Sequence, residues 1–228
     1  MMDELAPNVF LQRHALRLAG CHMGRVVTVI RLASGKTVIH STAAFLPEHV
    51  AEIREIGEPG WLVEATNFHD TCANDGRAAF ADVPYLVPPG FKGAERLNAS
   101  TLASLPSEWG DELDVIEVGG MPKIREQVFF HRPSKTLIVA DLLFNLPPDV
   151  GRWTHGFMRA VAGIRAYPGM SRLFRFCIKD RAAFTESMRA IAALDFERIV
   201  VAHGDPIVDN ANSTFNELLA MHGLSPQP

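Results

Sequence analysis

The segment that most constrains the fold is the stretch from Thr136 to Asn145, TLIVADLLFN, an apolar run interrupted by a single acid, Asp141. Runs of this kind form strands that are buried on both faces of a sheet. Burying an unpaired carboxylate costs on the order of several kcal/mol. Asp141 is therefore either a hydrogen-bonded structural acid at the end of its strand or an acid that faces a metal or catalytic cleft.

Two further apolar segments are also followed by side chains that can bind a metal ion. The apolar run in Arg198 to Pro206, RIVVAHGDP, leads into His203 and turns at Gly204. Another run, Trp61 to Thr66, opens into a polar loop with several metal-capable side chains, namely His69, Asp70, Cys72 and Asp75. Three expected strands therefore end near side chains that can bind a metal ion, and the sequence predicts that these side chains converge on one cleft.

Length and composition favour one compact domain spanning residues 1–228, with 47% hydrophobic residues and a net charge of -4. The charge is mixed along the chain, so we expect no nucleic-acid partner and no membrane partner. The cysteines, Cys21, Cys72 and Cys177, are odd in number and form no CxxC pair, which favours reduced thiols in a cytoplasmic protein. No segment resembles a signal peptide or a membrane span, so we expect a soluble, unprocessed chain. Oligomeric state is not indicated.

The order of elements predicts an α/β fold. Expected strands cover residues 24–32, 37–42, 61–66, 84–89, 115–118, 127–130, 136–144 and 198–203, with the first two as a hairpin and 84–89 as an edge strand because of its prolines. Expected helices run over residues 47–57, 76–80 and 153–164, from about residue 181 after the cap Asp180, and at the end of the chain with Thr214 and Glu217 as a capping box. Residues 90–114 are expected to be mainly loop. Hairpins combined with single helices fit two mixed sheets with helices outside.

At four places in the same order the sequence resembles the metallo-β-lactamase fold superfamily. These places are LASGKTVIHS, ATNFH, FFHRPSKTLIVADLLFN and IVVAHGDPI, and the resemblance covers nearly the whole chain. It implies a four-layer αββα sandwich of two mixed β-sheets with outer helices. It also implies that Asp141 stands at the position of the family's bridging aspartate and that His203 stands at the position of its terminal histidine.

The resemblance also implies that the family's two-metal site is degenerate here. In the HxHxDH loop of the family, His69 matches the second histidine, whereas the other three ligand positions hold Asn67, Thr71 and Cys72. Gly120-Met121 stands where the family has glycine-histidine, and His40 replaces the acid that ends the early hairpin strand. A two-metal centre needs nearly all of these ligands, so the sequence predicts one metal ion at most.

A single ion remains possible because His69, Asp141 and His203 supply two nitrogens and one oxygen, the minimum for an open catalytic site. Cys72 or His40 could complete the set, and the ion would be zinc, iron or manganese. The implied function is a hydrolase in which metal-activated water attacks an ester or phosphoester of unknown identity, with Asp141 and His69 as catalytic residues. Hydrolysis of β-lactams is not expected, because the ligands that this chemistry uses are missing.

Several alternatives stay open from the sequence. A histidine and an aspartate at neighbouring strand ends can hydrogen-bond each other without metal, and the chain could then be a non-catalytic relative that binds a small molecule or a protein in the inherited cleft. Cys72, next to His69, is either a thiol nucleophile or a half-buried packing residue. Four arginines, Arg165, Arg172, Arg175 and Arg181, form either a solvated face or a rim for an acidic substrate.

Overall fold

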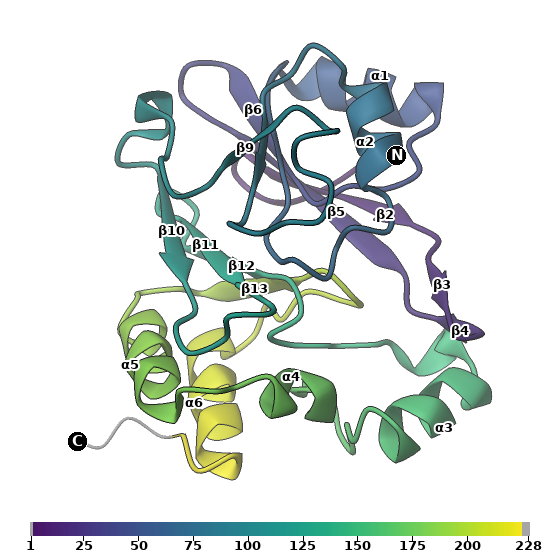
Figure 1. The fold of residues 1–228 in the computed structure, drawn as a ribbon, viewed down its shortest axis with the longest axis vertical. Helices are drawn as coiled ribbons and strands as arrows, with labels where there is room; N and C mark the ends of the chain where they lie inside the picture. Colours follow the sequence, from purple (N-terminus) through teal and green to yellow (C-terminus); the bar gives the residue numbers. More distant parts are fainter. Residues whose placement is uncertain (1, 225–228) are drawn as a thin grey trace.

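The computed structural model describes residues 2–224 and contains two facing sheets with helices on their outer sides (Figure 1). The larger sheet has seven strands in the order β1-β2-β5-β6-β7-β8-β9. Its strands are β1 Asp3–Ala6, β2 Val9–His14, β5 Arg25–Arg31, β6 Lys36–His40, β7 Glu58–Val63, β8 Tyr85–Val87 and β9 Ala99–Thr101. The smaller sheet has the order β10-β11-β12-β13, with β10 Leu113–Glu117, β11 Gln127–His131, β12 Thr136–Val139 and β13 Arg198–Val201. A separate short hairpin pairs β3 Arg17–Leu18 with β4 Cys21–His22.

Helices cover the two outer faces of this sandwich, and α3 packs beside the short β3–β4 hairpin (Figure 1). They are α1 Pro47–Ile56, α2 Ala73–Ala79, α3 Arg152–Ala160, α4 Arg172–Phe176, α5 Arg181–Ala192 and α6 Ala211–Met221, with short 3-10 turns at Ser107–Trp109 and Pro148–Val150. In Figure 1, α1 and α2 lie on the larger sheet, while α5 and α6 lie on the smaller one. No helix within residues 2–224 has both the length and the apolar character that a membrane crossing requires.

Strict alternation along the strands explains the layers. In β5, Val26 and Ile30 face the core between the sheets, while Val27 and Val29 face the helices outside. The same period places Ile138 of β12 between the sheets and its neighbours against α5 and α6. Because successive side chains of a strand point to opposite faces, strands that are apolar throughout must be covered on both sides.

The predicted four-layer αββα arrangement of two mixed sheets is confirmed. The hairpin of β5 and β6 is antiparallel, β6 pairs with β7 in parallel, and β12 pairs with β13 in parallel. Asp180 caps α5 as expected, since its carboxylate accepts the N–H groups of Ala182 and Ala183. All three cysteines are free.

Four details of the sequence prediction are wrong. β8 is not an edge strand, because β9 pairs with it from within the stretch 90–114 that was expected to be loop. β12 ends at Val139, five residues early, because the chain turns away at Asp141. The capping box of Thr214 and Glu217 is absent, since α6 already begins at Ala211. α4 was not predicted, because its single turn is too short for a periodic pattern.

The topology brings several strand ends to one edge of the sandwich. β12 and β13 are parallel and in register, so the residues that follow them emerge side by side. β5 runs the other way and begins at this edge, where the N–H of Val26 donates to the carbonyl of Ala202 (2.9 Å) and links the two sheets.

Candidate metal centre

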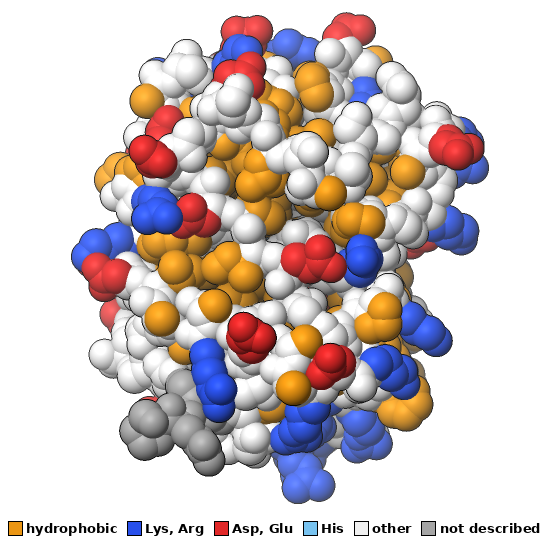
Figure 2. Space-filling model, turned by 60° about the vertical axis from the view of Figure 1, so that its left-hand side comes forward, with side chains coloured by type: hydrophobic (Ala, Val, Ile, Leu, Met, Phe, Trp, Pro, Cys, Tyr) orange, Lys and Arg blue, Asp and Glu red, His pale blue; other side chains and the backbone are white. Residues whose placement is uncertain are grey.

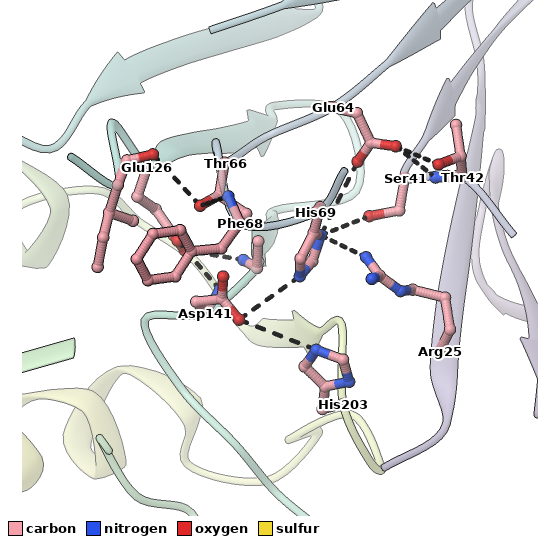
Figure 3. A network of polar contacts seen from close by, with 12 residues as sticks. Arg25, Ser41, Thr42, Glu64, Thr66, Phe68, His69, Glu126, Asp141 and His203 are labelled. Atoms are coloured by element: carbon pink, nitrogen blue, oxygen red, sulfur yellow. Dashed lines mark hydrogen bonds and ion pairs between the residues drawn. The ribbon is translucent and has the colours of Figure 1, made fainter. Parts of the chain in front are cut away.

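Three side chains from this edge converge, as Figure 3 shows. His69 lies in the loop after β7, Asp141 follows β12, and His203 follows β13. One ligand atom of each lies within 4.8 Å of those of the other two. Asp141 Oδ1 is 3.5 Å from His69 Nε2 and 3.9 Å from His203 Nε2. The predicted convergence of these three residues is therefore present.

The ring of His203 is held in a single orientation. Its Nδ1 is 2.7 Å from the carbonyl oxygen of Gly24, which can only accept, so Nδ1 carries the proton and donates. The unprotonated Nε2 then faces Asp141, and the ring of Phe144 stacks on the imidazole at 5.3 Å. Gly204 follows with φ of 113°, and a Cβ there would collide with the carbonyl of Asn145, so only glycine permits this turn. His203 thus offers a lone pair to the cleft.

Asp141 is positioned by a second acid, Glu126. The fully buried carboxylate of Glu126 accepts the backbone N–H groups of Ala140, Asp141 and Leu142 at 2.9 to 3.0 Å. It thereby fixes the turn through which the chain leaves β12. Asp141 Oδ2 is buried and has no hydrogen-bond partner among the described residues. This carboxylate is therefore rigidly placed but not fully satisfied.

The imidazole of His69 contacts the guanidinium of Arg25. Nη1 of Arg25, the first residue of β5, contacts Nδ1 of His69. A guanidinium only donates, so Nδ1 of His69 accepts, and the ring proton lies on Nε2, toward Asp141. Both side chains are buried. The tautomer of His69 is thus the opposite of the tautomer of His203.

A further buried acid, Glu64, completes this side of the cleft. Its carboxylate accepts from the backbone N–H of Thr42 (3.1 Å), the hydroxyl of Thr42 and the hydroxyl of Tyr85 (3.3 Å). Its Oε2 lies 3.9 Å from Nδ1 of His69. Glu64 and Arg25 therefore surround His69 with one fixed positive group and one acidic group.

The buried setting shifts the pKa of each titratable group in the cleft. Burial lowers the pKa of His69, and burial together with Arg25 lowers the pKa of His203 to about 3. Burial raises the pKa of Glu64 to about 7, against the opposing effect of Arg25. For Asp141, burial is outweighed by the two histidines and Arg25, and its pKa falls to about 2. At neutral pH the triad therefore consists of two neutral imidazoles and one carboxylate.

A cavity of about 550 Å³ opens beside the triad. Its walls are largely apolar and come from several separate segments of the chain, including Met23, Phe68, Phe144, Phe157 and Met158. Arg25 and all three triad residues also line it. This volume suits a small organic molecule.

The remaining residues predicted for the site are not part of the group of converging ligand atoms. Cys72 is half-buried at the start of α2, burial raises the pKa of its thiol, and it is not part of the group formed by the triad ligand atoms. His40 is buried, packs edge-on against Phe129 at 4.9 Å, and is also outside that group. Asn67 and Thr71 line the cavity, whereas Met121 is buried in the outer core with α5 and α6.

Sequence reasoning missed Arg25, Glu64 and Glu126. Arg25 opens a strand, where an arginine ordinarily marks an exposed end. Glu126 directly precedes β11, whose antiparallel pairing with β12 brings it opposite Asp141. A charged residue flanking each of two paired apolar strands is the signal that could have indicated this contact.

No protein-family model matches the sequence, and no curated protein matches it by sequence. Comparison of folds with solved structures gives full-length similarities. The DIM-1 metallo-β-lactamase exposed to ceftazidime has a TM-score of 0.63 and 16% identity, with 97% of each chain covered. A metallo-β-lactamase from Pontibacter korlensis has a TM-score of 0.63 and 15% identity over 96% of this chain and 98% of that chain.

A third structure, the metallo-β-lactamase FIM-1 from Pseudomonas aeruginosa in its mono-zinc form, has a TM-score of 0.64 and 12% identity. It covers 99% of this chain and 96% of that chain. Structural similarity at such low sequence identity establishes the fold alone, so the chemistry has to be argued from the residues of the site. With its two mixed sheets, outer helices and triad at the shared edge, the chain has the metallo-β-lactamase fold.

Proposed function

We propose that this protein is a metal-dependent hydrolase with a single-ion site formed by His69, Asp141 and His203. The observation that carries the proposal is the meeting of three ligand atoms within 4.8 Å on the wall of a largely apolar cavity. Two nitrogens and one oxygen suit zinc, iron or manganese and leave a position open for water or substrate. The mono-zinc form of FIM-1, on the same fold, supports the choice of one ion.

The donor set fits such an ion, with one adjustment. Asp141 Oδ2 is buried without a hydrogen-bond partner among the described residues, and a cation would satisfy it. His69 Nε2 is also buried without a partner there. His203 already holds the ligating tautomer. His69 does not, because ligation through Nε2 requires the proton on Nδ1, where Arg25 now donates. Metal binding at His69 therefore requires Arg25 to move off that nitrogen.

A bound ion would polarise the scissile carbonyl or phosphoryl group and lower the pKa of a coordinated water. The chain supplies the surroundings for this chemistry. Phe68, Phe157 and Met158 form apolar walls that hold the non-polar part of an ester or phosphoester and exclude water. Arg25, once released from His69, remains the cation nearest the negative charge of such a substrate. Glu126 keeps Asp141 in place throughout.

A second candidate is a non-catalytic protein that binds a small molecule in the same cavity. The contact between Arg25 and His69 favours it, because the guanidinium satisfies His69 without any metal. In that case the triad is a set of polar residues that lines the cavity without holding a metal ion. The two candidates differ in one measurable property, the affinity for divalent ions.

The test measures metal content and hydrolysis together. Protein purified without added metal is analysed for zinc, iron and manganese, and turnover of an ester and phosphoester panel is followed before and after chelation. The hydrolase predicts near-stoichiometric metal and turnover that chelation abolishes, with both lost in His203→Ala and retained in His22→Ala, a change at an exposed histidine of β4. A metal-free wild type with no thermal shift on adding these ions would overturn the hydrolase and leave the binding protein as the candidate to test. A β-lactam reporter in the same panel is expected to stay intact.

A further inference from the structure

A second cavity, of about 540 Å³, lies behind α4 on the side away from the triad. The short helix and the residue before it form a wall between the two cavities. Ser171 and Leu173 line the cavity of the triad, whereas Arg172 and Arg175 line the second one. The other walls of the second cavity are the loop from residue 163 to 170 and the end of α6.

The charge around this cavity is opposite to that of the whole chain. Between Arg152 and Arg181 there are seven basic residues and one acid, Asp180, although the chain carries a net charge of -4. Figure 2 shows basic side chains gathered along the lower edge of the molecule, the end where α4 and α6 lie in Figure 1. Concentrated positive charge in a concave surface raises the local concentration of anions.

The arginines of this cavity have no acidic partner among the described residues. No ion pair within residues 2–224 includes Arg165, Arg172 or Arg175. Arg181, in an adjoining pocket that Arg175 shares, donates to the backbone carbonyls of His222 and Gly223. A merely solvated face would normally intersperse acids among these arginines.

One buried donor in the cavity is unsatisfied. Nε of Arg175 is shielded from solvent and has no hydrogen-bond partner among the described residues. Leaving a charged donor buried without an acceptor is unfavourable, so such a group indicates a missing partner. His222 lies in the same cavity, and burial together with Arg175 lowers the pKa of its imidazole. The imidazole is therefore neutral at neutral pH, and the charged side chains that line the cavity, Arg165, Arg172 and Arg175, are all cations that can donate to an oxyanion.

We propose that this cavity is a binding site for a small multivalent oxyanion of the phosphate type, held by Arg165, Arg172 and Arg175. Planar guanidinium groups match the oxygens of phosphate in paired hydrogen bonds, which explains the use of arginine in place of lysine. The volume lies in the range of small-molecule sites. The site is independent of any metal at the triad and stands on different residues.

The experiment is isothermal titration calorimetry at constant ionic strength with inorganic phosphate, pyrophosphate and a single-stranded oligonucleotide. The wild type is compared with Arg172→Gln/Arg175→Gln. The matched control is Arg152→Gln/Arg159→Gln, which removes the same charge from exposed positions of α3. The single variant Arg172→Gln, at an exposed position, serves if the double variant fails to fold.

We expect at least a tenfold loss of pyrophosphate affinity in the double variant and no comparable loss in the control. Equal affinity for phosphate and pyrophosphate would identify a site for one phosphate group, and preference for pyrophosphate a site for a polyphosphate ligand. The proposal is overturned if neither anion binds at millimolar concentration, if both double variants weaken binding equally, or if the oligonucleotide alone binds.

Discussion

The two histidines of the triad face the same carboxylate with opposite tautomers. His203 donates from Nδ1 to a backbone carbonyl and presents a lone pair to Asp141. His69 accepts at Nδ1 from Arg25 and presents its N–H to Asp141. One half of the site is therefore prepared for a metal ion, while the other half is occupied by a cation that is part of the chain. The identity of the group behind each ring, a carbonyl or a guanidinium, decides which of the two states that ring adopts.

The largest loss of stability is expected at Glu126, which holds Asp141, the carboxylate that both histidines face. Replacing Glu126 by alanine leaves three buried backbone N–H groups without an acceptor, so we expect the free energy of unfolding to fall by about 3 kcal/mol or more. Glu126→Gln keeps one oxygen and should cost less. Urea unfolding measures both, with Glu117→Ala, at a more exposed position of β10, as the control. If Glu126→Ala lowers the free energy of unfolding by less than about 1 kcal/mol, the turn after β12 is stable without the Glu126 carboxylate.

Removing Arg25 tests the difference between the histidines directly. In Arg25→Met, Nδ1 of His69 is free to carry the proton, so the affinity for zinc or cobalt should rise by roughly 10- to 100-fold, the range by which outer partners tune a ligand. Competition with a chromophoric chelator measures this affinity. Nitrogen NMR of the metal-free protein should show His69 protonated on Nε2 in the wild type and His203 protonated on Nδ1 in both proteins.

The control for this change is Arg17→Met, at an exposed position of β3 that does not line the triad cavity. Unchanged or weaker metal binding in Arg25→Met, in a protein that remains folded, would contradict the view that Arg25 competes with the ion. It would then favour the second candidate function, in which the guanidinium is a permanent part of the cavity wall.

The sequence predicted one side of this comparison and missed the other. His203 ends an apolar run, so its place at the end of a strand follows from the strand pattern alone, whereas Asp141 interrupts its run and was predicted to face a cleft because a lone buried acid needs a partner. Arg25 reaches His69 across 44 positions of the chain, and Glu126 reaches the backbone at Asp141 across 15. Such contacts depend on strand pairing and on side-chain direction, which the periodicity of a single segment does not contain. The same limit explains β9, whose three small or polar residues carry no apolar signal.

Buried neutral histidines should make the metal-free protein sensitive to acid. Burial lowers the pKa of both His40 and His203 to about 3, whereas the unfolded chain has values near 6.5. Between these values each of these two histidines binds a proton in the unfolded state but not in the native state, so their contribution to the free energy of unfolding falls as pH falls from about 6.5 toward 3. Above pH 6.5 this contribution is constant. Urea midpoints measured across this range give the slope.

His40 separates this general effect from the site itself, since it lies outside the triad. His40→Leu should reduce the slope by up to about 1.4 kcal/mol per pH unit, which corresponds to one proton. An identical slope in wild type and variant would mean that His40 titrates alike in both states.

The smallest effect is expected at Cys72. Its thiol packs against the apolar cluster around Leu16, Met23 and Phe144, and burial raises its pKa, so little thiolate is present at neutral pH. Cys72→Ser should therefore change zinc affinity by less than about twofold and the free energy of unfolding by less than about 1 kcal/mol. Alkylation of the wild type by iodoacetamide should be slow. A large loss of zinc affinity would instead indicate that Cys72 is a fourth ligand, which approaches the ion when Arg25 leaves His69. The opposite tautomers of the two histidines would then describe only the metal-free state of the site.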